Sequence, residues 1–140
     1  MKALVVGFGS IGKRHYDILA SFLGAHNVYI VTRRETRLKN SFTSLESVED
    51  ISVFDYFVIA SKTSEHYDDL KYINSKVFGK KILVEKPLYE SKKPNFEVFN
   101  QIFVAYNLRF HPLVIQCKER LRDKKIISAR FYAGQYLPMW

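Results

Sequence analysis

Three glycines near the amino terminus constrain this chain more than any other feature. Gly7, Gly9 and Gly12 form a G-x-G-x-x-G motif between an apolar run, Ala3–Val6, and a helical pattern. In a dinucleotide-binding βα unit the first glycine permits a tight turn, the second admits a pyrophosphate and the third allows close helix–strand packing. An ordinary glycine-rich turn is the alternative, and the rest of the chain must decide between the two.

The helix that follows the motif would present its free backbone N–H groups, at Ser10 and Ile11, to the phosphates. The positive end of the helix dipole would add to this attraction. We therefore predict a cofactor-binding loop, which consists of Gly7, Phe8, Gly9, Ser10, Ile11 and Gly12.

Length and composition limit the class of protein. A chain of 140 residues with 47% hydrophobic content fits one domain with an ordinary core. No apolar run approaches the roughly 18 residues of a membrane span, and the amino terminus lacks a signal-peptide layout, so we expect a cytoplasmic protein without a membrane partner. The single cysteine, Cys117, excludes a multi-cysteine metal site, and its helical setting favours a buried structural thiol. We predict no metal.

The net charge of +8 raises the question of a nucleic-acid partner. The basic residues are scattered along the chain, and no helix-turn-helix, zinc-finger or aromatic RNA-binding signature accompanies them. We therefore expect solvated faces and an anionic small ligand, with no nucleic acid bound.

Apolar runs alternate with helical patterns along the whole chain. Expected strands cover residues 2–6, 27–32, 41–43, 55–61, 81–84, 101–106 and 126–132. Expected helices cover residues 10–23, 45–51, 64–77, 94–99 and 111–123. This order predicts an α/β fold: a doubly wound, parallel, Rossmann-type sheet of about six strands with helices on both faces. We assign residues 1–125 to this domain and residues 126–140 to the start of a second α/β domain that is otherwise missing.

The end of the second predicted strand indicates which dinucleotide binds. An acidic residue at this place bonds the ribose 2′-hydroxyl of NAD, whereas arginine accommodates the 2′-phosphate of NADP. This chain has Thr32, Arg33 and Arg34 there, and no acid before Glu35. Because a guanidinium can hold a phosphate with two hydrogen bonds, we predict that NADP is favoured over NAD. A solvated helix start and stacking on adenine are the alternatives.

Four motifs resemble one known family in their order and spacing. They are residues 7–12, 61–66, 85–87 and 107–112, and the resemblance to the Gfo/Idh/MocA oxidoreductases (glucose–fructose oxidoreductase and inositol dehydrogenase) covers the whole chain. The first three of these motifs end at the carboxyl edge of the predicted sheet, where ligands bind in such folds. The last seven residues more weakly resemble members encoded with bacterial surface-sugar and nonulosonic-acid pathways.

The resemblance implies roles for individual residues. Lys86 corresponds to the catalytic lysine beside the nicotinamide, although a surface lysine is the alternative for this residue taken alone. Glu85 would bond the nicotinamide ribose, Pro87 would follow a cis peptide bond, and Ser61 and Thr63 would line the ribose and nicotinamide side.

Three further residues complete the predicted site and its surroundings. His66 belongs to the cofactor-site motif, with a structural role favoured over a chemical one. Arg109 would lie near the substrate, and a structural salt bridge is the alternative. His15 is interpreted as a surface or packing residue.

The resemblance also implies what the chain lacks. Family members continue into a second domain with the sugar pocket, an aspartate–histidine pair and a dimer surface, and residues 132–140 look like its first strand. We therefore expect a homo-oligomeric NAD(P)-dependent oxidoreductase that transfers hydride to or from a sugar hydroxyl, represented here by an inactive fragment. A non-enzymatic dinucleotide-binding module or redox sensor is the alternative.

Overall fold

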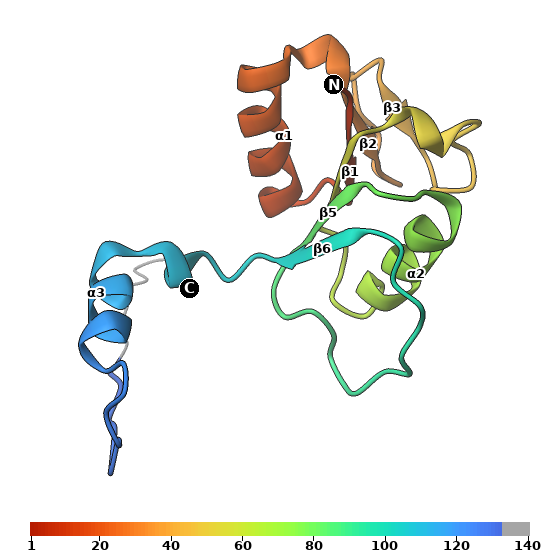
Figure 1. Ribbon diagram of the computed structural model, residues 1–140. Helices are drawn as coiled ribbons and strands as arrows, with labels where there is room; N and C mark the ends of the chain where they lie inside the picture. Colours follow the sequence, from red (N-terminus) through yellow and green to blue (C-terminus); the bar gives the residue numbers. More distant parts are fainter. Residues whose placement is uncertain (133–140) are drawn as a thin grey trace. The chain divides into compact units, whose positions relative to one another are not determined.

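The computed structural model describes residues 1–132 and divides the chain into two compact units, 1–106 and 107–140. The first unit holds a six-stranded sheet in which all neighbouring strands are parallel (Figure 1). The strands are β1 (Ala3–Val6), β2 (Val28–Val31), β3 (Ser41–Phe42), β4 (Tyr56–Ile59), β5 (Lys81–Val84) and β6 (Gln101–Val104). Their order is β3-β2-β1-β4-β5-β6, so the chain reverses direction across the sheet between β1 and β4. The predicted Rossmann-type sheet is confirmed, and a crevice is expected at this reversal point.

Two helices cover opposite faces of the sheet (Figure 1). The first, α1 (Ser10–Leu23), packs Leu19 and Leu23 against β1, β2 and β4. The second, α2 (His66–Lys76), packs Leu70 and Ile73 against the other face. Successive side chains of a strand point to opposite faces of the sheet, so Leu4 and Val6 of β1 belong to the core under α2, whereas Val5 belongs to the core under α1.

The boundaries of α1 match the prediction, but its apolar stripe is only partly buried. Leu19 and Leu23 face the sheet, whereas Ile18 and Phe22 are exposed. Gly24 ends the helix with a φ of 80° and donates its N–H to the carbonyl of Ala20. The short helix η1 (Ala25–Asn27) then leads into β2.

The predicted helix over residues 45–51 is wrong. Leu45, Val48 and Ile51 are all buried, as the apolar spacing indicated, but the segment forms turns that end in the short helix η2 (Ile51–Val53). Ser47 donates from its hydroxyl to the carbonyl of Ser44, and Asp50 accepts from the backbone N–H of Ser52. Such local side-chain bonds replace the hydrogen bonds that a helix would have made.

The predicted helix over residues 94–99 is also wrong, because a buried asparagine holds this segment in an irregular conformation. Asn74 donates to the carbonyl of Glu97 at 2.7 Å and accepts from the N–H of Phe99 at 3.1 Å. These backbone groups are therefore satisfied from α2 rather than from within the segment.

The second unit, described as far as residue 132, contains η3 (Asn107–Phe110) and α3 (Pro112–Arg120). Residues 126–132 do not form the predicted strand, since the described part of this unit offers no strand to pair with them. Cys117 is exposed, so the prediction of a buried thiol is wrong. The predicted strand at residues 132–140 falls almost wholly outside the described residues, and the boundary at residue 125 stays a prediction.

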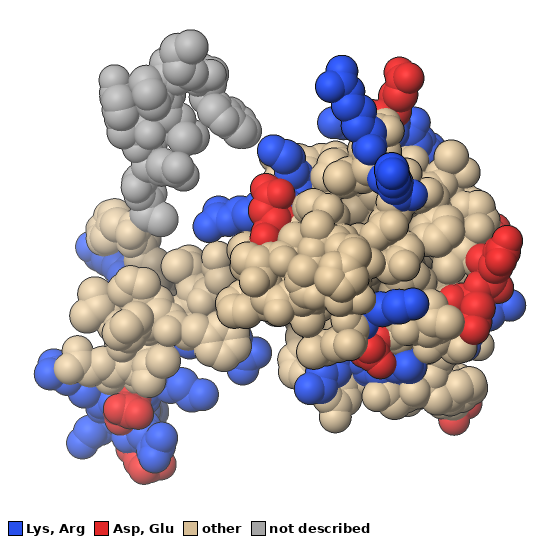
Figure 2. Space-filling model, turned by 90° about the horizontal axis from the view of Figure 1, so that it is seen from above, with Lys and Arg blue, Asp and Glu red and all other residues tan. Residues whose placement is uncertain are grey.

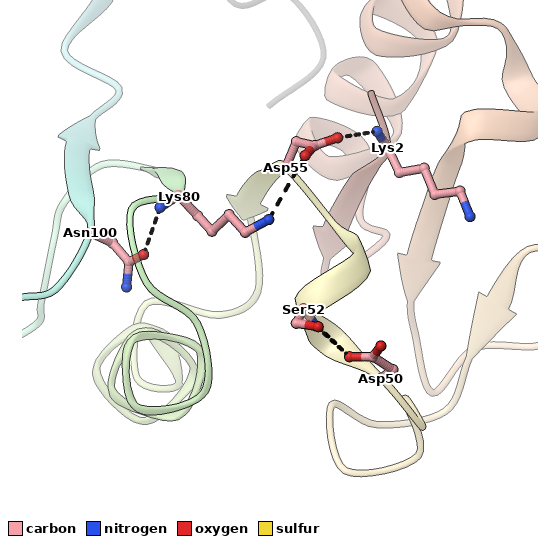
Figure 3. Close-up of polar contacts among 6 residues, drawn as sticks. All are labelled: Lys2, Asp50, Ser52, Asp55, Lys80 and Asn100. Atoms are coloured by element: carbon pink, nitrogen blue, oxygen red, sulfur yellow. Dashed lines mark hydrogen bonds and ion pairs between the residues drawn. The ribbon is translucent and has the colours of Figure 1, made fainter.

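The amino ends of the strands are tied together by polar contacts (Figure 3). Asp55 accepts from the backbone N–H of Lys2 at 2.9 Å and lies 3.8 Å from the ammonium of Lys80. The backbone N–H of Lys80 donates to the side chain of Asn100 at 2.9 Å. These contacts connect the segments that lead into β1, β4, β5 and β6.

Charged side chains are dispersed over the face drawn in Figure 2, with acidic groups between the basic ones. The excess of 22 basic over 14 acidic residues therefore does not form one continuous basic patch on this face. Among the described residues, no helix has both the length and the hydropathy needed to cross a membrane.

Candidate functional site: a cavity at the carboxyl edge of the sheet

A cavity of about 540 Å³ opens where β1, β2 and β4 end. This volume lies within the range of small-molecule sites. Nine of the predicted cofactor-binding residues line it: Gly7, Phe8, Gly9, Ser10, Ile11, Thr32, Arg33, Arg34 and Ser61. The strand-order reversal thus brings together residues that are distant in the sequence.

The three glycines differ in their steric surroundings. Gly7 has a φ of 89°, which side chains rarely permit, and a Cβ on it would lie 2.5 Å from the backbone nitrogen of Ser61. Gly12 packs so closely that a Cβ would lie 2.0 Å from the carbonyl oxygen of Gly7. A Cβ on Gly9 would meet no atom within 4 Å, so this position faces open space.

The start of α1 suits an anion. Gly9 is the residue that precedes the helix, and no side chain among the described residues caps it. Its first N–H groups therefore lack side-chain partners, at the positive end of the helix dipole. Together with the open space at Gly9, this arrangement fits the pyrophosphate of a dinucleotide.

The end of β2 supplies positive charge to the same cavity. Thr32 is buried, and its hydroxyl oxygen accepts from the N–H of Arg34 at 3.1 Å, which fixes the turn after the strand. Arg33 is 83% exposed at its side chain and lies 3.6 Å from a carboxylate oxygen of Glu65. Because this ion pair is solvated, the guanidinium can exchange it for another anion at little cost.

Sequence reasoning missed several residues that line the cavity. The loop after β3 contributes Ser44 and Glu46, and α2 contributes Asp69. Lys62 and Glu65 also line the cavity; they lie in the predicted motif of residues 61–66 but were not predicted as site residues. The pairing of β3 with β2 explains the first group, because it places the loop after β3 beside the end of β2. That pairing has no signature in the sequence.

Asp69 is a partly buried acid that lines the cavity. Its carboxylate accepts from the hydroxyl of Ser61 at 2.5 Å. Burial raises the pKa of Asp69 above its ordinary value, and the Ser61 hydrogen bond offsets this only in part. By contrast, hydrogen bonds from its own backbone N–H and from Ser44 lower the pKa of Glu46.

Lys86 lies at the same edge of the sheet, outside the residues that line the cavity. Ile59 pairs with Val84, and Ser61 and Lys86 each lie two residues further on, so the register aligns them. Lys86 is exposed, and its bond to Pro87 is cis. Glu85 accepts from the ring of His15 at 2.7 Å, a contact that the sequence did not indicate.

His66 joins the two segments that follow β4 and β5. The residue is 1% exposed, with Nδ1 3.1 Å from the carbonyl oxygen of Pro87 and Nε2 3.2 Å from that of Ser61. Both partners are acceptors, and a neutral ring can donate to only one of them. Thr63 lies in the turn just before His66, and its backbone carbonyl oxygen accepts from the N–H of His66.

Arg109 belongs to the second unit, on η3, where its guanidinium lies 5.6 Å from the centre of the Phe110 ring. Its predicted place near a substrate stays a prediction.

The sequence matches the model of a protein family, in agreement with the parallel sheet, the glycine loop and the cavity at the point where the strand order reverses. The Gfo/Idh/MocA model, described as an oxidoreductase family with an NAD-binding Rossmann fold, matches residues 1–101. The chain belongs to this family. No curated protein matches the chain.

Solved structures share the fold of this Gfo/Idh/MocA protein at low identity. The WlbA dehydrogenase of Chromobacterium violaceum, in complex with NADH and UDP-GlcNAcA, is 16% identical with a TM-score of 0.65, over 89% of this chain and 40% of its own. The probable oxidoreductase yhhX is 17% identical with a TM-score of 0.64, over 87% of this chain and 40% of its own. A super-repressor mutant of Gal80p from Saccharomyces cerevisiae is 17% identical with a TM-score of 0.52, over 86% of this chain and 38% of its own. The Gfo/Idh/MocA chain thus spans about two fifths of the length of these structures.

Proposed function

We propose that this chain binds NADP(H) for an oxidoreductase that transfers hydride to or from a hydroxyl of a sugar or sugar derivative. Family membership supports a nicotinamide cofactor. The observation that carries the choice of NADP is the position of Arg33 and Arg34, which line one cavity with the glycine loop. Two guanidinium groups there would hold the 2′-phosphate that distinguishes NADP from NAD.

Different residues of this chain would bind different parts of the cofactor. The N–H groups at the start of α1 would bind the pyrophosphate, and Arg33 and Arg34 would bind the adenosine end. The nicotinamide, when bound, supplies or accepts the hydride. The ammonium group of Lys86 would donate a hydrogen bond to the oxygen of the reacting hydroxyl, and its charge would stabilise the negative charge that develops on that oxygen.

A sugar substrate is supported by the WlbA dehydrogenase, whose structure contains a sugar nucleotide together with NADH. We extend this to a sugar nucleotide or related sugar, in surface-polysaccharide or nonulosonic-acid synthesis, for a cytoplasmic homo-oligomer. Since the chain spans 40% of that relative, we expect these 140 residues to bind the cofactor without turnover.

Nucleotide titration tests the cofactor proposal directly. NADPH and NADH fluorescence would be measured with the wild type, Arg33→Ala and Arg34→Ala. We expect tighter binding of NADPH than of NADH, and a loss of about tenfold in NADPH affinity in each variant, since a charge-assisted pair is lost. Arg37→Ala serves as the control, because Arg37 is an exposed arginine of the same connection between β2 and β3 and does not line the cavity. An unchanged NADPH preference in both variants would contradict the proposed role of the end of β2.

A non-enzymatic dinucleotide-binding module is the second candidate. It is favoured by the likeness to Gal80p, since the solved structure is that of a repressor with this fold. Joining this chain to the second domain of a family enzyme, with Lys86→Ala as the control, separates the two. Turnover of a sugar substrate that is lost in the variant supports the enzyme, and cofactor binding without any turnover supports the module.

A further inference from the structure

We propose that His15 is a positioning residue, which holds Glu85 and thereby the backbone of Lys86 at the nicotinamide end of the site. This inference rests on the proposed cofactor function. It deepens that function, because it gives α1 a role at the nicotinamide end of the bound dinucleotide as well as at the pyrophosphate.

The contact between His15 and Glu85 is short and partly shielded from water. Nε2 of His15 lies 2.7 Å from Oε1 of Glu85, and the two side chains are 19% and 14% exposed. An ionised carboxylate can only accept hydrogen bonds, so Nε2 must carry the proton that it donates. A hydrogen bond to a charged group in such a place is stronger than one between neutral groups.

Both oxygens of the Glu85 carboxylate are engaged. Oε1 accepts from His15, and Oε2 accepts from the backbone N–H of Lys86 at 3.2 Å. The backbone N–H of Glu85 donates to the carbonyl of Ile59 at 2.9 Å, which fixes the main chain at the end of β5. What remains free is the side-chain rotamer of Glu85, and the His15 ring selects it.

The position of His15 on α1 gives this contact its functional meaning. The helix begins at Ser10, directly after the loop that would bind the pyrophosphate, and His15 lies in its second turn. The same rigid helix therefore fixes the phosphate loop and the Glu85 carboxylate relative to each other. The far side of the segment is held separately, since His66 contacts the carbonyl of Pro87.

Two ligands separate the ends of the site. NADPH spans both ends, whereas adenosine 2′,5′-bisphosphate contains only the adenosine end. Their dissociation constants would be measured for the full chain in the wild type, His15→Leu and His15→Gln, where glutamine returns an N–H near the position of Nε2. His26→Leu is the matched control, because this histidine lies on η1 and contacts the neighbouring Asn27.

We expect His15→Leu to weaken NADPH binding about tenfold, the effect of one hydrogen bond to a charged group. Binding of the bisphosphate should change less than about twofold in all variants, and His15→Gln should recover most of the NADPH affinity. Equal weakening of both ligands, no weakening at all, or failure of glutamine to restore binding would each overturn the inference and leave the proposed function standing. A wild-type chain that binds neither nucleotide would overturn both.

Discussion

The two ends of this sheet are built on opposite principles. At the amino end, the side chains of Asp55 and Asn100 fill the gaps between strands with hydrogen bonds. At the carboxyl end, the chain turns at Gly7, whose φ of 89° disfavours a side chain, and the first N–H groups of α1 have no side-chain cap. Among the described residues, no buried side-chain nitrogen or oxygen lacks a partner. The N–H groups at the start of α1, which have no side-chain cap, lie at the end of the sheet that faces the cavity.

This contrast predicts that changes at the amino end alter stability, while changes at the carboxyl end alter binding unless they disturb close packing. Gly12 is the exception that should have the largest effect. A methyl group there would lie 2.0 Å from the carbonyl oxygen of Gly7, so the backbone itself must move. We expect Gly12→Ala to lower the free energy of unfolding by about 3 kcal/mol or more and to abolish NADPH binding, as measured by urea unfolding and fluorescence titration.

Gly9→Ala is the matched control for this prediction. Its added methyl group meets no atom within 4 Å, and the φ of −78° suits alanine. Stability should fall by less than about 1 kcal/mol, the cost of a poorer residue before the helix. Binding of NADPH should still weaken, about tenfold or more, because the methyl group occupies the path of the pyrophosphate. Equal stability losses in the two variants would remove the steric distinction between these glycines.

Asn100 provides the corresponding test at the amino end. Its buried amide donates to Asn74 and to the carbonyl of Val77, and its oxygen accepts from the N–H of Lys80. Asn100→Leu removes these three hydrogen bonds and takes this partner from the carbonyl of Val77 and the N–H of Lys80, so the free energy of unfolding should fall by about 2–3 kcal/mol. The dissociation constant for NADPH should stay within about twofold of the wild type.

Asn95, an exposed residue of the same long segment, is the control for Asn100. Asn95→Leu should change the free energy of unfolding by less than about 0.5 kcal/mol. A tenfold loss of NADPH affinity in Asn100→Leu at a temperature where the protein stays folded would show that the two ends of the sheet are not independent.

The glycine motif and the buried strands could be predicted because each depends on local requirements. The turn at Gly7 needs a positive φ, and apolar runs such as β1 and β4 are buried on both faces, so the sequence indicates where these strands lie. Their exact ends differ, since the strand expected over residues 55–61 is β4 (Tyr56–Ile59). The rule for the end of the second strand in dinucleotide-binding folds pointed to Arg33 and Arg34, and the family resemblance implied the cis bond before Pro87.

The remaining features depend on contacts between distant segments. Asn74 holds the chain near residue 97, and His15 meets Glu85 across 70 residues, so neither contact is visible as a periodicity. The Glu46 contribution to the cavity depends on β3 pairing with β2 at the sheet margin. Sequence patterns indicate which faces of a helix or strand are buried. The order of the strands decides which polar side chains come close enough to hydrogen-bond to the backbone of a given loop.

Substitution of Asp69 should have the smallest effect on stability and binding, and it tests the electrostatics of the carboxyl end of the sheet. Burial raises the pKa of this carboxyl, so its ionisation near neutral pH costs folding free energy, and that cost disappears as the pH falls towards the ordinary range of aspartate. Asp69→Asn should therefore raise the melting temperature at pH 7, with the gain shrinking at lower pH. It should also tighten NADPH binding about threefold, because one negative charge leaves a cavity that receives phosphates.

Asp68→Asn is the matched control, since Asp68 is exposed and lies in the same first turn of α2, so both changes lose the same interaction with the helix dipole. Identical pH profiles and NADPH affinities for the two variants would mean that the charge of Asp69 does not reach the cofactor.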